Sequence, residues 1–128
     1  MKIDLHCHTK AIKKGDGSGR NVTPELFKIK IENADIKIVA ITNHNAFDID
    51  QYRRLCSTVD GICQVWPGVE IDVQEPQSKR WHLIVVANPK EVVQFSANVS
   101  SLFEGDNLEE CTHTKEYTRK PDRNIRIG

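Results

Sequence analysis

The chain has 128 residues, a length at which globular proteins commonly form one domain. Eighteen Lys and Arg residues balance eighteen Asp and Glu residues, so no net charge attracts the chain to nucleic acid or to an anionic membrane surface. No apolar run approaches the roughly 20 residues that a membrane-spanning helix needs. Because Met1 leads directly into an expected strand rather than a signal peptide, the sequence predicts a cytoplasmic protein.

The first half of the chain predicts a strand, a helix and a second strand. Alternating polar and apolar residues at 2–6 indicate a short strand, and the Lys- and Gly-rich segment 11–20 indicates a loop. Thr23 followed by Pro24 is typical of a helix N-terminus. The nearly continuous β-branched run 36–42 predicts a strand that is buried on both faces, as in parallel sheets.

The second half predicts a helix, two strands and a last helix. Residues 48–59 have an aspartate N-cap and indicate a helix. Residues 62–73 form a strand region that a Pro-Gly pair is expected to interrupt, and 81–87 is a further buried strand. An Asn-Pro pair then opens a helix over 88–103. The order of strands and helices favours an α/β domain with a mostly parallel sheet.

Histidines and a carboxylate lie near the ends of these strands. His6 and His8 are two residues apart on an extended chain, so both side chains leave on the same side. His44 follows the next strand and reaches the same edge, where loops after parallel strands converge. The segment between Glu70 and His82 is too short for a parallel crossover, so a hairpin is expected to bring them together.

These residue types in this arrangement predict a metal site. Asp16, in a glycine-rich loop, can fold over the same edge. Imidazoles and carboxylates without thiolates suit Zn²⁺, Mn²⁺ or Fe²⁺, and a carboxylate such as Glu70 can bridge two ions. Ions in such a site activate water and neutralise phosphoryl oxygens, which is the chemistry of phosphoester hydrolysis.

The four cysteines include no Cys-x-x-Cys pair and are expected to be reduced and to pack in the protein interior as small apolar residues.

Four segments in this order, DLHCHT, ITNHN, PGVEI and HLIVV, resemble the first motifs of the PHP (polymerase and histidinol phosphatase) family. The resemblance covers the chain up to about position 90. It implies a partial distorted β/α barrel, TIM-like and PHP-type, with mostly parallel strands and one hairpin. It also implies a site of two or three divalent metal ions and the hydrolysis of phosphoesters.

The resemblance assigns roles to the candidate residues one by one. His6 and His8 are implied as ligands of one metal, and Glu70 as the bridging carboxylate. His82 is implied as a ligand of a second metal. Asp16 and His44 are implied to serve a further ion.

Three departures from the family pattern stand out. Asn43 occupies the position before His44 where the family usually has an aspartate. The loop that carries Asp16 is longer than the common spacing. Nothing after His82 matches the later histidine and the Asp-x-His pair that complete the family site, and His113 is expected at the surface. The expected organisation is therefore the N-terminal part of a PHP-like domain over 1–105, followed by an irregular, disordered basic tail over 106–128.

The leading functional hypothesis is a truncated metal-dependent phosphoesterase that hydrolyses a phosphomonoester or phosphodiester with metal-activated water. The expected substrate is a phosphorylated small molecule or a nucleic-acid end. The alternatives are a non-catalytic PHP remnant, or a metal-binding fragment of a larger polymerase or ATPase that handles nucleic acid. Because a partial barrel leaves a strand unpaired at its edge, association through that edge is expected as well, with no membrane partner.

Overall fold

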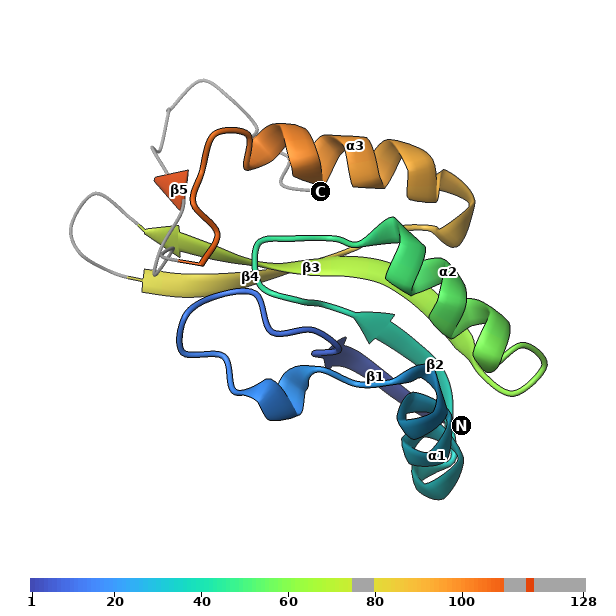
Figure 1. Ribbon diagram of the computed structural model, residues 1–128. Coiled ribbons are helices and arrows are strands. Elements are labelled where there is room, and N and C mark those ends of the chain that lie inside the picture. Colours follow the sequence, from blue (N-terminus) through green and yellow to red (C-terminus); the bar gives the residue numbers. More distant parts are fainter. Residues whose placement is uncertain (75–79, 110–114, 117–128) are drawn as a thin grey trace.

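The computed structural model describes residues 1–74, 80–109 and 115–116 (Figure 1). Two short 3-10 turns, Ser18–Arg20 and Pro89–Glu91, precede the first and third helices. The strands and helices follow in the order β1 (Lys2–Cys7), α1 (Pro24–Ala34), β2 (Ile36–Ile41), α2 (Ile49–Thr58), β3 (Gln64–Gln74), β4 (Arg80–Val86), α3 (Val92–Leu102) and β5 (Lys115–Glu116).

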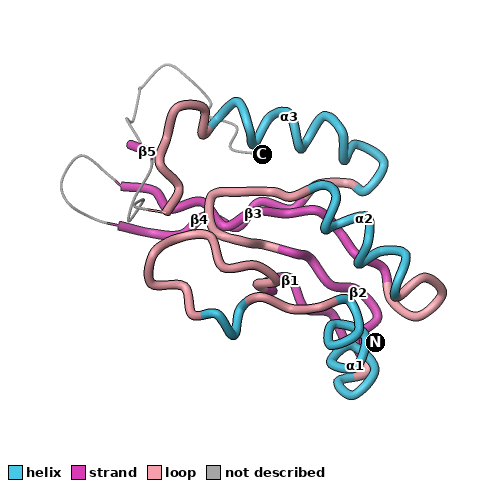
Figure 2. Tube along the Cα trace, in the orientation of Figure 1, coloured by secondary structure: helices cyan, strands magenta, loops and turns pink. Residues whose placement is uncertain are grey.

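The sheet is mixed, with the strand order β1-β2-β3-β4. β1 pairs parallel with β2, and β2 pairs parallel with β3. β3 and β4 form an antiparallel hairpin in which Gly68–Gln74 face Arg80–Val86, and β5 pairs parallel with the end of β3. Figure 2 shows how β1, β2, β3 and β4 lie and the long loop that follows β1.

This arrangement corrects the expected fold class. The four strands form an open half-barrel with three helices, and the prediction of a TIM-like barrel with mostly parallel strands is wrong. The physical reason is that the path β1-β2-β3-β4 is too short to close on itself as a barrel, and the hairpin that was expected after β3 contributes the longest pairing of the sheet, which is antiparallel. Of the expected irregular tail, residues 106–109 are coil and turn, 115–116 pair with β3, and the rest lie outside the described residues.

The Pro-Gly pair does not interrupt β3, contrary to expectation. Residues 64–67 of this strand pair with β2, and residues 68–74 pair with β4. A Cβ at Gly68 would lie 2.9 Å from both Ile41 O and Val85 O, so only glycine fits between the two neighbouring strands. The pair therefore marks the point where β3 exchanges one main partner for another.

Helix starts follow the local sequence signals. The Thr23 side chain accepts a hydrogen bond from Leu26 N, and the Asp48 side chain accepts one from Gln51 N. Asn88 caps the 3-10 turn before α3 in the same way, through Lys90 N. Each cap satisfies a backbone N–H that has no partner inside the helix.

Two apolar clusters attach the helices to the sheet. The first joins α1 and α2 to β2, and the second joins α3 to β3. In β3 the odd-numbered Val69, Ile71 and Val73 pack in the second cluster. Since successive side chains on a strand point to opposite faces, Glu70 and Asp72 face the other side of the sheet.

β1 forms one end of the strand order, and the described residues pair it with β2 alone. Its apolar side chains Ile3 and Leu5 are about half exposed. Association through this edge stays a prediction.

Within the described ranges, no helix is long and apolar enough to cross a membrane.

Candidate metal centre

The three neighbouring strands bring distant residues to one place. Thr42 N donates to Cys7 O, and Cys7 N donates to the Thr42 hydroxyl, so the ends of β1 and β2 are tied together. Beyond β2, Asn45 N donates to Glu70 O, and Glu70 N donates to Asn43 O. These backbone bonds fix His44 beside Glu70, as a parallel bridge that extends the pairing of β2 with β3.

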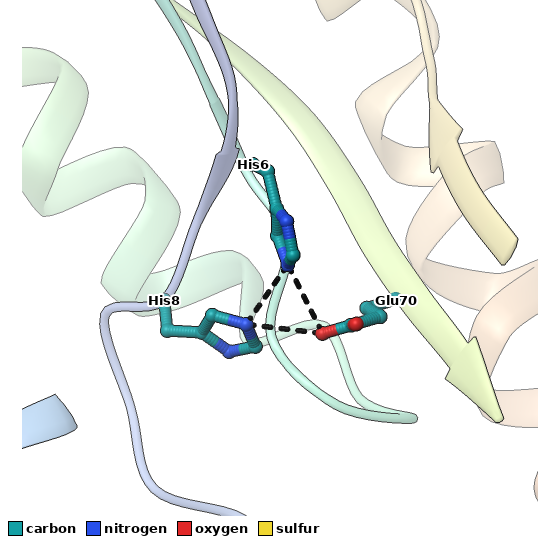
Figure 3. A group of neighbouring side chains, drawn as sticks. All are labelled: His6, His8 and Glu70. Atoms are coloured by element: carbon teal, nitrogen blue, oxygen red, sulfur yellow. Dashed lines mark hydrogen bonds and ion pairs between the residues drawn. The ribbon is translucent and has the colours of Figure 1, made fainter. Parts of the chain in front are cut away.

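His6, His8 and Glu70 form a compact group (Figure 3). His8 Nε2 lies 3.0 Å from Glu70 Oε2, and His6 Nε2 lies 3.3 Å from the same oxygen. The two Nε2 atoms are 3.1 Å apart. The Glu70 side chain is only 3% exposed, whereas that of His6 is 53% exposed. This group could hold a metal ion, with the carboxylate at its base and one imidazole at its open side.

The other three predicted residues surround this group. His82 Nδ1 lies 2.9 Å from Glu70 Oε1, and His44 Nδ1 lies 3.4 Å from Glu70 Oε2. Asp16 Oδ1 is 3.7 Å from His44 Nε2. The structure thus brings all six predicted residues together, while the compact three-ligand group contains His6, His8 and Glu70.

Sequence reasoning missed Asp72, which belongs to the same cluster. Its Oδ1 lies 3.1 Å from His82 Nε2 and 3.8 Å from His44 Nδ1, and the residue is 1% exposed. Two signals could have identified it. Asp72 is two residues after Glu70 on one strand, so both point to the same face, and it is the cross-strand partner of His82.

Asn43 has a structural role beside the cluster. Its Oδ1 accepts hydrogen bonds from Thr9 N at 2.8 Å and Lys10 N at 3.0 Å, and its Nδ2 donates to the Thr9 hydroxyl. Gln51 Nε2 donates to Thr9 O, which completes the attachment of the chain just after His8. Asn43 therefore holds the backbone next to the histidine pair, with its amide oxygen occupied by two N–H groups.

Asp16 is held on both of its oxygens. Its Oδ2 accepts from Ile12 N and Lys13 N, and its Oδ1 accepts from the Arg20 guanidinium at 2.8 Å. Burial raises the pKa of the Asp16 carboxyl, but these backbone bonds and the nearby positive charges more than offset it, so the pKa lies below its ordinary value. Asp16 is thus a carboxylate at neutral pH.

The chain was compared with protein-family models, with curated proteins and with solved structures. Nothing matched. The resemblance to the PHP family therefore stays a prediction, carried by the four sequence motifs.

The residues present fit a divalent cation. His8 Nδ1, His44 Nδ1 and Asp72 Oδ1 are buried and have no hydrogen bond within the described part of the chain. Buried polar atoms without hydrogen bonds destabilise the folded state. A cation bound between imidazole nitrogens and carboxylate oxygens would remove this destabilisation for the atoms that face the cation. Burial lowers the pKa of both His8 and His44, which favours the neutral imidazole that a metal requires.

Cys7 is not part of the cluster. It packs against the apolar cluster between β2 and the first two helices, and burial raises the pKa of its thiol to about 11. A thiol that is protonated at neutral pH is a poor metal ligand. Cys56 and Cys63 are half-buried against the same cluster, and Cys111 lies outside the described residues.

Proposed function

We propose that this chain is a metal-dependent phosphoesterase module of the PHP type, which hydrolyses a phosphomonoester or phosphodiester. One observation carries the proposal. A single buried carboxylate, Glu70, has four imidazoles within 3.4 Å of its oxygens, two from strands β1 and β4 and two from the segments that follow β1 and β2. Such a carboxylate suits a bridging position between divalent ions.

His6, His8 and Glu70 would hold one ion, and His44, His82 and Asp16 lie where they could serve others. Bound divalent ions would lower the pKa of a coordinated water and neutralise charge on phosphoryl oxygens. The side chains of the protein would position the substrate and supply positive charge beside it. The Arg20 guanidinium is tied to Asp16 with its side chain 40% exposed, so it can donate further hydrogen bonds to a phosphoryl group at the rim.

The nearest hydroxyl to the histidine pair in sequence is not arranged as a nucleophile. Thr9 is fully buried, and its hydroxyl donates to Gln51 Oε1 while it accepts from Asn43 Nδ2. A role for activated water is consistent with this arrangement. The substrate that we propose is a phosphorylated small molecule or a nucleic-acid end.

A second candidate is a metal-binding module without turnover, as a remnant or as part of a larger protein. The open half-barrel favours it, because His6 and His82 are more than half exposed. An exposed ion is less shielded from water, and the electrostatic stabilisation of a transition state is then weaker.

Two measurements separate these candidates. Elemental analysis of the purified chain is expected to find at least one divalent ion per chain, and a folded metal-free protein would contradict both. Hydrolysis of an aryl phosphate in Mn²⁺ is then expected for the wild type and is expected to vanish in His8→Ala. Glu32→Gln, on the exposed face of α1, serves as the control. Bound metal without hydrolysis in the wild type would support the non-catalytic module.

A further inference from the structure

Asp72 and Lys13 form a buried ion pair at the edge of the cluster. Lys13 Nζ lies 2.6 Å from Asp72 Oδ2, and the two side chains are 19% and 2% exposed. Lys13 comes from the long loop after β1, whereas Asp72 lies in β3. The loop is held in place next to Lys13, because Lys14 N donates to Glu109 O and Lys13 N donates to Asp16 Oδ2.

The two oxygens of Asp72 have different surroundings. Oδ2 receives the Lys13 ammonium and, at 3.5 Å, the Asn45 amide. Oδ1 is buried without a hydrogen bond in the described part of the chain, and it is turned toward His82 Nε2 and His44 Nδ1. His44 Nδ1 is likewise buried without a hydrogen bond there. A carboxylate oxygen and an imidazole nitrogen, both buried without a hydrogen bond in the described part of the chain, therefore lie 3.8 Å apart.

Two carboxylates are buried close together at this place. Glu70 and Asp72 put two buried carboxylates on one face of β3, and burying carboxylates without positive charge is costly. Lys13 places one positive charge within salt-bridge distance of Asp72. A lysine ammonium is a single charge on a flexible stem, which a divalent ion at the same carboxylates can displace.

We propose that Asp72 is a further ligand at the second divalent-cation position implied for Glu70 and His82, and that the Lys13 ammonium competes with the ion for Asp72. The ammonium holds the position when the ion is absent and weakens the binding of the second ion. The first ion, at His6, His8 and Glu70, is affected less because Lys13 contacts Asp72 and not those histidines. The inference rests on the proposed metal-dependent function, but its test uses metal binding alone.

The test is a calorimetric titration of the metal-stripped full chain with Mn²⁺. The wild type is expected to show a tight and a weak binding event. In Lys13→Met the weak event is expected to strengthen by about tenfold or more, because a positive charge a few ångström from the ion is removed. In Asp72→Asn the weak event is expected to disappear while the tight one remains.

Two further variants control for charge and for folding. Lys13→Arg keeps the positive charge and is expected to retain the weak second event. Lys10→Met removes a lysine from the same loop, where it pairs with Asp48 outside the cluster, and should leave both events unchanged. Identical isotherms for the wild type and Lys13→Met, or two events in Asp72→Asn, would overturn the inference. Two bound ions without hydrolysis would contradict only the proposed function.

Discussion

His6 and Glu70 are 64 positions apart in the sequence, and His6 Nε2 lies 3.3 Å from Glu70 Oε2. The contact depends on the parallel register of β1, β2 and β3, since β1 and β2 end beside the middle of β3, where Glu70 lies. The cluster is therefore a product of the sheet rather than of a local motif. A change that displaces one of these strands is expected to separate the ligands as well as to destabilise the fold.

Replacement of Glu70 by glutamine is expected to abolish stabilisation by metal. An ion that binds only the folded chain stabilises it by about 2.7 kcal/mol at a hundred times its dissociation constant. Wild-type protein should thus melt at a higher temperature in Mn²⁺ or Zn²⁺ than in chelator. Glu70→Gln should show no such shift by thermal unfolding, because it lacks the charge that faces the histidines. A full shift in this variant would contradict the central position of Glu70.

Replacement of Gly68 by alanine is expected to destabilise the sheet. The added Cβ would lie 2.9 Å from Ile41 O, from Val85 O and from a methyl group of Thr42. Two of these atoms belong to strand backbones and cannot move without disturbing the pairing of β3. Overpacking of this kind costs about 1–3 kcal/mol, measurable by denaturant unfolding of the metal-free protein.

The matched control for this variant is Gly17→Ala. No atom lies within 4 Å of a Cβ built at Gly17, so its free energy of unfolding should stay close to that of the wild type. Equal stabilities of the two variants would argue against the close approach of three strands at Gly68.

Substitutions of Asn43 can distinguish a structural role of this residue from a role in metal binding. Asn43→Ala removes the acceptor for the N–H groups of Thr9 and Lys10. Since Thr9 is fully buried, the loss is expected to cost about 2–3 kcal/mol of unfolding free energy. Asn43→Asp keeps an oxygen for both donors and should be less destabilised. Its Mn²⁺ stoichiometry should equal that of the wild type, and an additional bound ion would show that position 43 can ligate.

Local signals predicted much of this structure. Thr23 and Asp48 indicated helix starts because capping involves groups only three residues apart. The short segment after β3 indicated a hairpin, and the hairpin placed His82 beside Glu70. The six candidate residues could be expected at one edge because strand ends converge there.

What failed depended on non-local packing. The share of parallel pairing was overestimated because the apolar runs of β2 and β4 are typical of strands that are buried on both faces, as in parallel sheets. The Pro-Gly pair was taken for a break, since its sequence carries no information about the strands on either side. Asp72 was missed although it follows Glu70 by two residues, because its position opposite His82 depends on the register of the hairpin, which the residue types alone do not specify.

Asp48 provides a pH-dependent contribution to stability that is separate from the metal cluster. Its Oδ1 accepts from Gln51 N at the start of α2, and its Oδ2 lies 2.9 Å from Lys10 Nζ. The backbone hydrogen bond, followed by the bond to Lys10, holds the pKa of this carboxyl below its ordinary value of 3.8. The stabilisation is then fully present above the unfolded-state pKa and is lost as the pH falls through the lower folded-state pKa.

Asp48→Asn keeps the helix cap, because asparagine is as good an N-cap as aspartate, but it loses the charge. The wild type is therefore expected to exceed this variant in unfolding free energy by a constant amount at neutral pH, and the difference should shrink below pH 3.8. Asp48→Ala, which also loses the cap, should cost about 1 kcal/mol more. Denaturant unfolding in chelator at a series of pH values measures both effects, with exposed Asp60→Asn as the control for one lost charge. A difference that widens on acidification would contradict the ion pair, because protonation of Asp48 can only remove its attraction to Lys10.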